Sequence, residues 1–163
     1  MPILNHSQFI TSLKPDAKLL GLDISKTSIG IGFADVSTGI VTPVMVIKRA
    51  RLKGDAAKLL KLIQEYGATG LVCGWPLHMD GSEGKRCQAV KDTASELLKN
   101  MPPIPLTFQD ERLSTSQAYT QVEEMVCKSL NKRGKNAVKV VDNHAAMIIL
   151  RSFLEALPAF RSA

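Results

Sequence analysis

The order in which apolar patterns follow one another constrains the fold of this chain most strongly. Before residue 50 the sequence contains three segments rich in apolar and β-branched residues, at 18–25, 27–36 and 40–48. Only short connections separate them, and the second connection contains the turn sequence "DVSTG". Strands joined by such short connections pair antiparallel. This part of the chain therefore predicts a three-stranded antiparallel meander.

The pattern then changes to the period of a helix. Apolar residues from Leu52 to Tyr66 recur at helical spacing until Gly67 supplies a stop. The remaining predicted elements are a strand at 69–75, a helix at 84–100, a strand at 105–109, a helix that begins at Ser114 with a capping box to Gln117, and a last helix with Ala146, Ile149, Phe153 and Leu157 on one face. Strands linked by helices pair in parallel through right-handed crossovers. We therefore predict an α/β fold with a mixed five-stranded sheet, three antiparallel strands followed by parallel strands, flanked by helices.

The predicted elements belong to one domain with short ends. The sequence contains no internal repeat, low-complexity tract or Gly/Ser linker that would divide it. We expect residues 18–158 to form the domain, residues 1–17 to be a flexible N-terminal extension, and residues 159–163 to be a C-terminal tail.

The charge balance points to an anionic partner. The chain has 21 Lys and Arg residues against 15 Asp and Glu, which gives a formal net charge of +6 and a pI of about 9.3. Such an excess favours nucleic acid first, although many basic proteins bind none. No apolar run approaches the roughly 20 residues needed to span a membrane, so we expect no membrane partner.

The cysteines and the N-terminal residues bear on the compartment. The three cysteines are widely spaced and form no C-x-x-C pair. This pattern argues against a disulfide framework or a structural zinc site, and for a reducing compartment. The first 17 residues lack a basic start followed by an apolar core, and they contain no arginine. We expect a cytoplasmic location, with an organelle as the open alternative.

Acids stand at three places in the predicted fold: within the first strand, at the end of the fifth strand and at the start of the last helix. Asp23 alternates with Leu22 and Ile24 in the first strand and so points to the opposite face, where a buried, unpaired carboxylate would be costly. Asp110 and Glu111 end the fifth strand, and alternation allows only one of them to point inward. Asp142 begins the last helix, above its apolar face. One acid from each place could converge.

Converging carboxylates without His or Cys partners suit Mg²⁺ or Mn²⁺. Two such ions about 4 Å apart can activate a water molecule and stabilise a leaving oxygen in phosphodiester cleavage. The acids at the strand end and at the helix start also have plainer explanations. Asp142 could be an N-cap, which is the commoner role of a lone aspartate there. Asp110, Glu111 and Arg112 could form a solvated turn. The interior of a strand offers Asp23 no such role.

Four stretches of the sequence together resemble a known family. They are "LLGLDISKTSIGIGFAD", "LVCGWPLHMDGSEG", "QDERLSTSQA" and "VVDNHAA". In this order and spacing they resemble the YqgF/RuvX group of the RNase H-like superfamily, described as Holliday-junction resolvases and as nucleases that mature the small-subunit ribosomal RNA precursor. The resemblance implies an RNase H-like fold and a Mg²⁺- or Mn²⁺-dependent endonuclease. Its catalytic and metal-binding acids fall on Asp23, Glu111 and Asp142.

Basic residues beside the proposed phosphodiester site are candidates to contact nucleic acid, either an RNA precursor or branched DNA. We assign this role to Lys26 and Arg112, and to Lys132, Arg133 and Lys135 in an acid-free basic segment before Asp142. From charge alone, that segment could equally be a solvated loop. A junction resolvase would act as a homodimer, because it cuts two strands symmetrically.

The chain departs from the family pattern after Asp23, where Ser25 and Lys26 replace a Gly-Thr pair. Lys26 could contact phosphate or compete with a metal ion. Trp75 could stack on a base or pack in the protein, and we expect a surface or hydrogen-bonding role for His78. Two rival functions stay open. One is a catalytically silent nucleic-acid-binding module. The other is the nucleotide-binding lobe of an actin- or sugar-kinase-type ATPase, which would need a second lobe.

Overall fold

The computed structural model describes residues 3–78, 80–110 and 144–157. Its elements are α1 (His6–Ser12), β1 (Lys18–Ile24), β2 (Ser28–Asp35), β3 (Val41–Lys48), α2 (Leu52–Tyr66), β4 (Gly70–Trp75), α3 (Lys85–Lys99), β5 (Leu106–Asp110) and α6 (His144–Glu155). The predicted helix from Ser114 and the start of the last helix at Asp142 lie outside the described residues.

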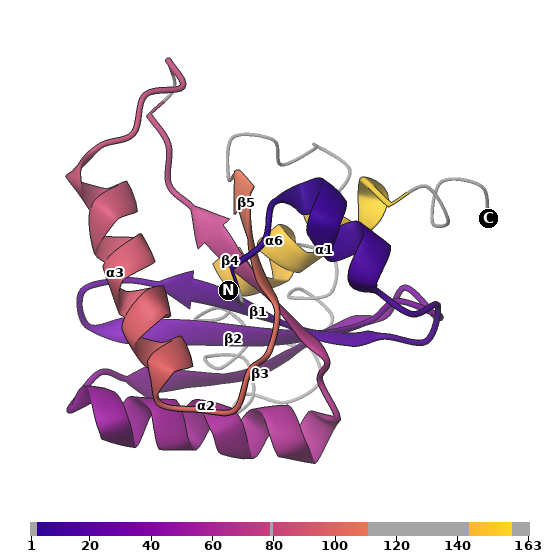
Figure 1. The fold of residues 1–163 in the computed structure, drawn as a ribbon, viewed down its shortest axis with the longest axis horizontal. Coiled ribbons are helices and arrows are strands. Elements are labelled where there is room, and N and C mark those ends of the chain that lie inside the picture. The colour runs from indigo at the N-terminus through magenta and orange to yellow at the C-terminus, as the bar shows by residue number, and fades with distance from the viewer. Residues whose placement is uncertain (1–2, 79, 111–143, 158–163) are drawn as a thin grey trace, which may run out of the picture.

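The strands form one mixed sheet in the order β3-β2-β1-β4-β5 (Figure 1). The pairs β1–β2 and β2–β3 are antiparallel, whereas β1–β4 and β4–β5 are parallel. This arrangement confirms the predicted meander followed by parallel strands. It also places β1 at the centre of the sheet, so that Asp23, which lies opposite Gly30 of β2, sits in the central strand.

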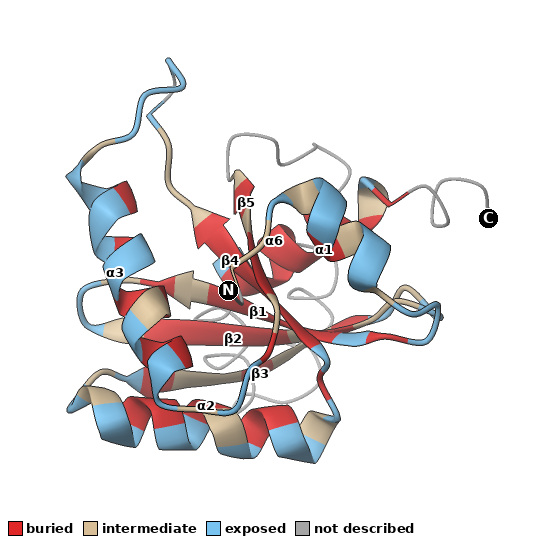
Figure 2. Ribbon diagram, viewed as in Figure 1, coloured by how far each residue is buried: buried red, intermediate tan, exposed pale blue. Residues whose placement is uncertain are grey.

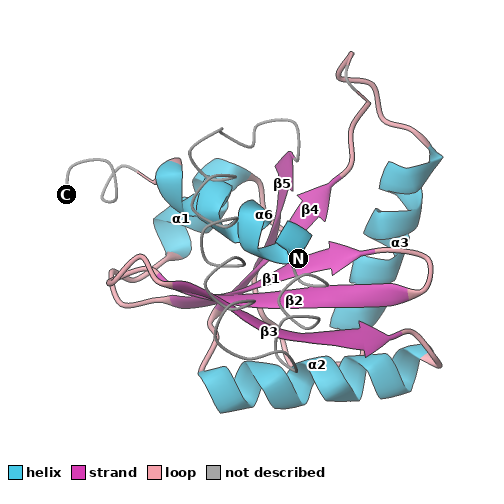
Figure 3. Ribbon diagram, turned by 180° about the vertical axis from the view of Figure 1, so that it is seen from behind, coloured by secondary structure: helices cyan, strands magenta, loops and turns pink. Residues whose placement is uncertain are grey.

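Helices cover both faces of the sheet (Figure 3). The helices α2 and α3 pack on one face, where Leu20, Leu22 and Ile24 of β1 join the core they share. The helices α6 and α1 pack on the other face, with Leu19 of β1 and Phe153 of α6 in a second cluster. Figure 2 shows the buried residues concentrated in the sheet and on the sides of the helices that face it. Alternate residues of β1 therefore belong to different layers.

Two glycines allow α6 to approach the sheet closely. A Cβ atom at Gly21 would lie 2.5 Å from Leu150 Cγ and 3.0 Å from the backbone oxygen of Ala146. At Gly32 the nearest contact would be 3.1 Å, again to Leu150. A side chain at Gly21 would have to displace Leu150, and one at Gly32 would fit only tightly. The first turns of α6 thus lie directly over β1, two residues from Asp23.

The N-terminal segment packs on the domain, which corrects the expectation of a flexible extension. Asn5 and Gln8 form a capping box that starts α1, with Gln8 N donating to Asn5 Oδ1 at 2.8 Å. Phe9 is completely buried and packs edge-to-face on Phe153, with ring centroids 5.5 Å apart. Ile3 also forms an isolated bridge with Leu106 of β5. Burial of Phe9 holds this segment against the α6 face.

Candidate active site

Asp23 lies at the carboxyl end of the central strand, on the face that α6 covers. Its neighbours Leu22 and Ile24 face α2 and α3, so strand alternation turns its carboxylate to the other side. The side chain is half-buried, and no described residue donates a hydrogen bond to it. Burial raises the pKa of Asp23, while the nearby Arg86 guanidinium acts in the opposite direction and lowers it. The Asp23 carboxylate is thus kept partly away from water, and none of the described residues is its hydrogen-bonding partner.

Asp110 belongs to the opposite face. Phe108 of β5 packs against the core under α2 and α3, and alternation places Asp110 on the same side. Thr107 and Gln109 point to the side that faces α6, and both are buried. Asp110 and Asp23 therefore lie on different faces of the sheet.

The other predicted site residues lie outside the described part of the chain. They are Glu111, Arg112, Lys132, Arg133, Lys135 and Asp142. Within the described residues, no group of three or more His, Cys, Asp or Glu side chains is arranged to hold a metal ion. The structure therefore positions Asp23 and Lys26 among the predicted residues, and the convergence of the three acids stays a prediction.

The loop between β4 and α3 is held by its own hydrogen bonds. Asp80 Oδ1 accepts from Ser82 N at 2.9 Å and from Ser82 Oγ at 2.6 Å, which lowers the pKa of Asp80. His78 N donates to Ser82 O at 3.0 Å, and the His78 ring fills the space beside Gly84, where a side chain would collide with it. His78 is exposed, as expected of a surface residue, and its ring packs beside Gly84.

Trp75 packs within the protein. Its ring lies 4.6 Å from that of Phe108, measured between centroids, and its residue is half-buried. This contact joins the ends of β4 and β5, since Trp75 is the register partner of Asp110. Of its two predicted roles, the structure shows packing.

The turn after Asp23 forms without a glycine. Ser25 N donates to Ser28 O at 2.9 Å, and Ser28 N donates to Ser25 Oγ at 3.1 Å. Across the described residues, only glycines adopt positive φ, so Ser25 and Lys26 need no left-handed backbone. Arg49 Nη1 donates to Ser25 O at 2.7 Å and fixes the turn from the end of β3. The departure from the family's glycine therefore leaves an ordered turn.

Sequence reasoning missed three cations near this turn. Arg49, Lys85 and Arg86 surround the end of β1 together with Lys26 and Ser25. Lys85 and Arg86 could have been noticed in the sequence. They stand in the first turn of a predicted helix, where the helix dipole disfavours positive charge, so two cations there are unusual. Arg49 gave no such signal, since it follows a strand far away in the sequence.

The sequence comparisons place the chain in a family. The family model RuvX, described as Holliday junction resolvase, matches residues 17–156. The chain belongs to the RuvX family. A relative from Paramagnetospirillum magneticum named "Putative pre-16S rRNA nuclease" is 39% identical over 160 residues, which cover 98% of this chain and 99% of the relative. A relative from Caulobacter vibrioides with the same name is 38% identical over 157 residues, which cover 96% and 98% of the two chains.

The fold comparison agrees with this RuvX assignment. The structure of Thermus thermophilus RuvC in complex with a Holliday junction substrate matches with a TM-score of 0.55 and 17% identity, covering 86% of this chain and 94% of RuvC. A further Thermus thermophilus RuvC structure matches with a TM-score of 0.51. These similarities, with the sheet order above, confirm the RNase H-like fold. Among the described residues, no helix is both long and apolar enough to cross a lipid bilayer.

Proposed function

We propose that this protein is a metal-dependent nuclease that hydrolyses phosphodiester bonds in structured nucleic acid. The observation that carries the proposal is Asp23, a half-buried carboxylate at the end of the central strand of an RNase H-like sheet, with no hydrogen-bond donor among the described residues. A charge in this setting is costly unless a cation accompanies it. Membership of the RuvX family supports the reading of Asp23 as a catalytic acid.

The oxygen-rich set Asp23, Glu111 and Asp142 fits Mg²⁺ or Mn²⁺. If the alternation of β5 continues beyond Asp110, Glu111 falls on the face of Thr107 and Gln109, which is also the face of Asp23. Asp142 precedes α6, whose first turns lie over Gly21. Both observations support convergence of these acids at the end of β1.

A bound divalent ion would polarise the scissile phosphate and activate a water molecule. The chain's own residues would prepare this step. Asp23 has to be ionised to hold the metal, and Arg86 favours the ionised form against the effect of burial. Lys26, Arg112, Lys132, Arg133 and Lys135 would bind the phosphates on either side, as positioning contacts that are independent of sequence.

We propose the precursor of small-subunit ribosomal RNA as the first substrate to test, because the relatives that match almost the whole chain carry that name. Such a role implies a cytoplasmic location. Junction DNA is the second candidate, favoured by the family description and the similarity to RuvC. It carries the further requirement of a homodimer that cuts two strands.

The test is cleavage of a labelled ribosomal RNA precursor fragment and of a four-way DNA junction, with Mg²⁺, with Mn²⁺ and with a chelator. We expect metal-dependent cleavage of the RNA by the parent, and loss of cleavage with retained binding in Asp23→Asn. Gel filtration with light scattering would show whether junction cleavage accompanies a dimer. Binding without cleavage of either substrate would contradict the proposal and favour the silent binding module.

A further inference from the structure

A cavity of about 580 Å³ opens beside the end of β1, on the side of α2 and α3. Its lining comes from three separate segments: the β1–β2 turn with Lys26, the residue after β3, Arg49, and the start of α3 with Lys85 and Arg86. The volume lies within the range of small-molecule binding sites, and it is large enough for a nucleotide. Four cationic residues thus line one cavity, and none of the described residues that line it is acidic.

None of the four cations forms an ion pair within the described part of the chain. Arg49 is held by hydrogen bonds to neutral groups, since it donates to Ser25 O at 2.7 Å and to Thr93 Oγ1 at 3.2 Å. Arg86 interacts electrostatically with the Asp23 carboxylate, whose pKa it lowers, whereas no described carboxylate is paired with Lys26 or Lys85. Like charges gathered around one cavity repel one another, and an anion bound among them would relieve that repulsion.

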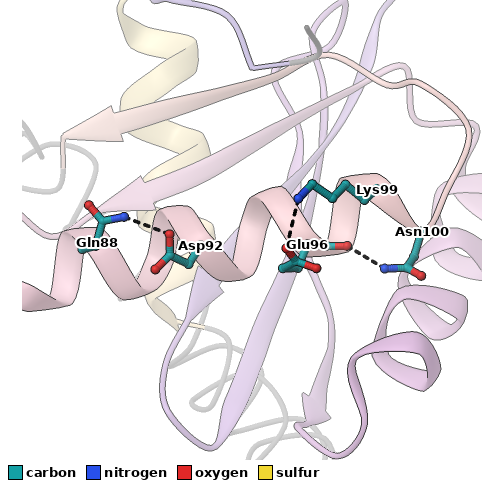
Figure 4. A network of polar contacts seen from close by, with 5 residues as sticks. All are labelled: Gln88, Asp92, Glu96, Lys99 and Asn100. Carbon is teal, nitrogen blue, oxygen red and sulfur yellow. Dashed lines mark hydrogen bonds and ion pairs between the residues drawn. The ribbon is translucent and has the colours of Figure 1, made fainter.

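The first turn of α3 adds positive potential to the same place. It contains no acidic residue, and Gly84 at its N-cap provides no side-chain hydrogen bond. The positive end of the helix dipole therefore meets Lys85 and Arg86 directly. Further along α3, Gln88 Nε2 donates to Asp92 Oδ1 and Lys99 Nζ contacts Glu96 (Figure 4). Lys85 and Arg86 therefore line the cavity at the positive end of the helix, whereas Lys91 lies outside it.

The remaining walls are aliphatic. Ile24 and Val90 are buried, and Ala89 is exposed at the rim of the cavity. A bare phosphate would leave these walls uncovered, whereas the sugar of a nucleotide would contact them. Arg86 lines the cavity and also lowers the pKa of Asp23, so the cavity adjoins the proposed reaction centre. Because Ile24 and Asp23 face opposite sides of the sheet, the cavity and the Asp23 carboxylate are distinct places.

We infer that this cavity binds one nucleotide unit of the substrate strand, outside the metal-binding acids. Lys26, Lys85 and Arg86 hold its phosphate, and the aliphatic walls contact its sugar. The inference rests on the proposed function, because it assigns the path of the strand next to the reaction centre. It adds a positioning contact that needs no metal ion.

The experiment measures binding of adenosine 5′-monophosphate and of a short labelled single-stranded RNA to the metal-free protein by fluorescence anisotropy. We expect the monophosphate to displace the RNA and adenosine to fail, because the cations recognise the phosphate. Lys85→Ala should weaken binding of the monophosphate about three- to tenfold, the range expected for one exposed charge-assisted contact. The control Lys91→Ala removes the same charge from an exposed position on α3 outside the cavity, and it should leave that binding unchanged.

Ala89→Leu distinguishes a cavity from a merely basic surface. This substitution fills the rim without altering charge and keeps a strong helix former at an exposed site, so the fold should persist. We expect it to weaken binding of the monophosphate at least as much as Lys85→Ala does. If Ala89→Leu has no effect while Lys85→Ala and Lys91→Ala weaken RNA binding equally, the cations act only as a general attraction and the inference is wrong. Thermal unfolding of each variant checks that it is folded.

The outcome is separable from that of the proposed function. A parent that cleaves nucleic acid but binds no adenosine 5′-monophosphate would overturn the cavity assignment and leave the nuclease standing. A parent that binds the monophosphate with the expected variant pattern, yet cleaves nothing, would support the cavity as a nucleotide site and remove the nuclease.

Discussion

Replacing Asp23 by Asn should stabilise the metal-free protein and abolish its stabilisation by Mg²⁺. The Asp23 carboxylate is half-buried without a hydrogen-bond donor among the described residues, and burial raises its pKa against the opposing effect of Arg86. Asparagine has almost the same shape but no charge to desolvate. The substitution therefore removes the cost of burying a charge from the metal-free protein, and it removes a metal ligand from the metal-bound protein.

The pH dependence of the metal-free parent follows from the same shift. Since the folded pKa of Asp23 lies above its ordinary value of 3.8, the folded protein holds this proton more tightly than the unfolded chain does. The resulting stabilisation is greatest below pH 3.8 and is lost as the pH rises through the raised pKa. The advantage of Asp23→Asn over the parent should therefore grow through the acidic range and reach its full value at neutral pH.

The effect of metal can be given a magnitude. An ion that binds only the folded state, at about ten times its Kd, stabilises that state by about 1.4 kcal/mol. For a domain of this size that corresponds to roughly 3–6 °C in Tm. Differential scanning calorimetry at neutral pH, first with a chelator and then with Mg²⁺, should show this increase in the parent and little of it in Asp23→Asn. An equal increase in both proteins, or a variant that melts earlier than the parent without metal, would show that Asp23 is neither a metal ligand nor a destabilising charge.

Four further sets of substitutions test the other assignments made above. Glu111→Gln should abolish metal-dependent cleavage while nucleic-acid binding survives. Asp110→Asn should reduce cleavage much less, because Asp110 lies on the face of the sheet opposite Asp23. If cleavage assays gave the reverse result for the two variants, the catalytic acid would be Asp110. Neutralising Lys132 and Arg133 together should reduce the slope of log affinity against log salt by roughly 0.7 to 0.9 per lost phosphate contact, and an unchanged slope would indicate a solvated loop. Phe9→Ala should cost about 3–5 kcal/mol in urea denaturation, because Phe9 is completely buried against Phe153; a loss below about 1 kcal/mol would mean that α1 does not hold the core. Ser25→Gly should lower stability by about 1 kcal/mol, since the Ser25 Oγ contact with Ser28 is lost, and it should not increase cleavage.

The sheet could be predicted from the sequence because its signals are local. Leu20, Leu22 and Ile24 alternate along β1, and the apolar face of α2 ends at Gly67, which adopts the positive φ of 65° that stops the helix. The helix α1 escaped prediction for the same reason. It has seven residues, and Phe9 is the one that is buried, so there is no periodic pattern to detect. Its place depends on Phe153, far away in the sequence.

In the candidate site, too, the sequence predicts features with a local signal and misses those that depend on the fold. Asp23 was identifiable because a carboxylate within an apolar strand contradicts the local pattern. The cavity was not, because Lys26, Arg49 and Lys85 belong to segments that come together only through the sheet and through the packing of α3. Each of these cations, seen singly, is an ordinary surface residue.

The turn at Ser25 and Lys26 shows why the departure from the family pattern need not disable the site. A glycine there would let a phosphate approach the backbone, but the described turn needs no positive φ, and Ser25 stabilises it through Ser28. The change also places Lys26 among the residues that line the cavity, together with Arg86. A backbone contact to phosphate would thus be exchanged for a side-chain contact, which acts at a longer range and depends more on salt. The turn therefore remains compatible with a working nuclease, and its lysine forms part of the basic surface that such an enzyme needs.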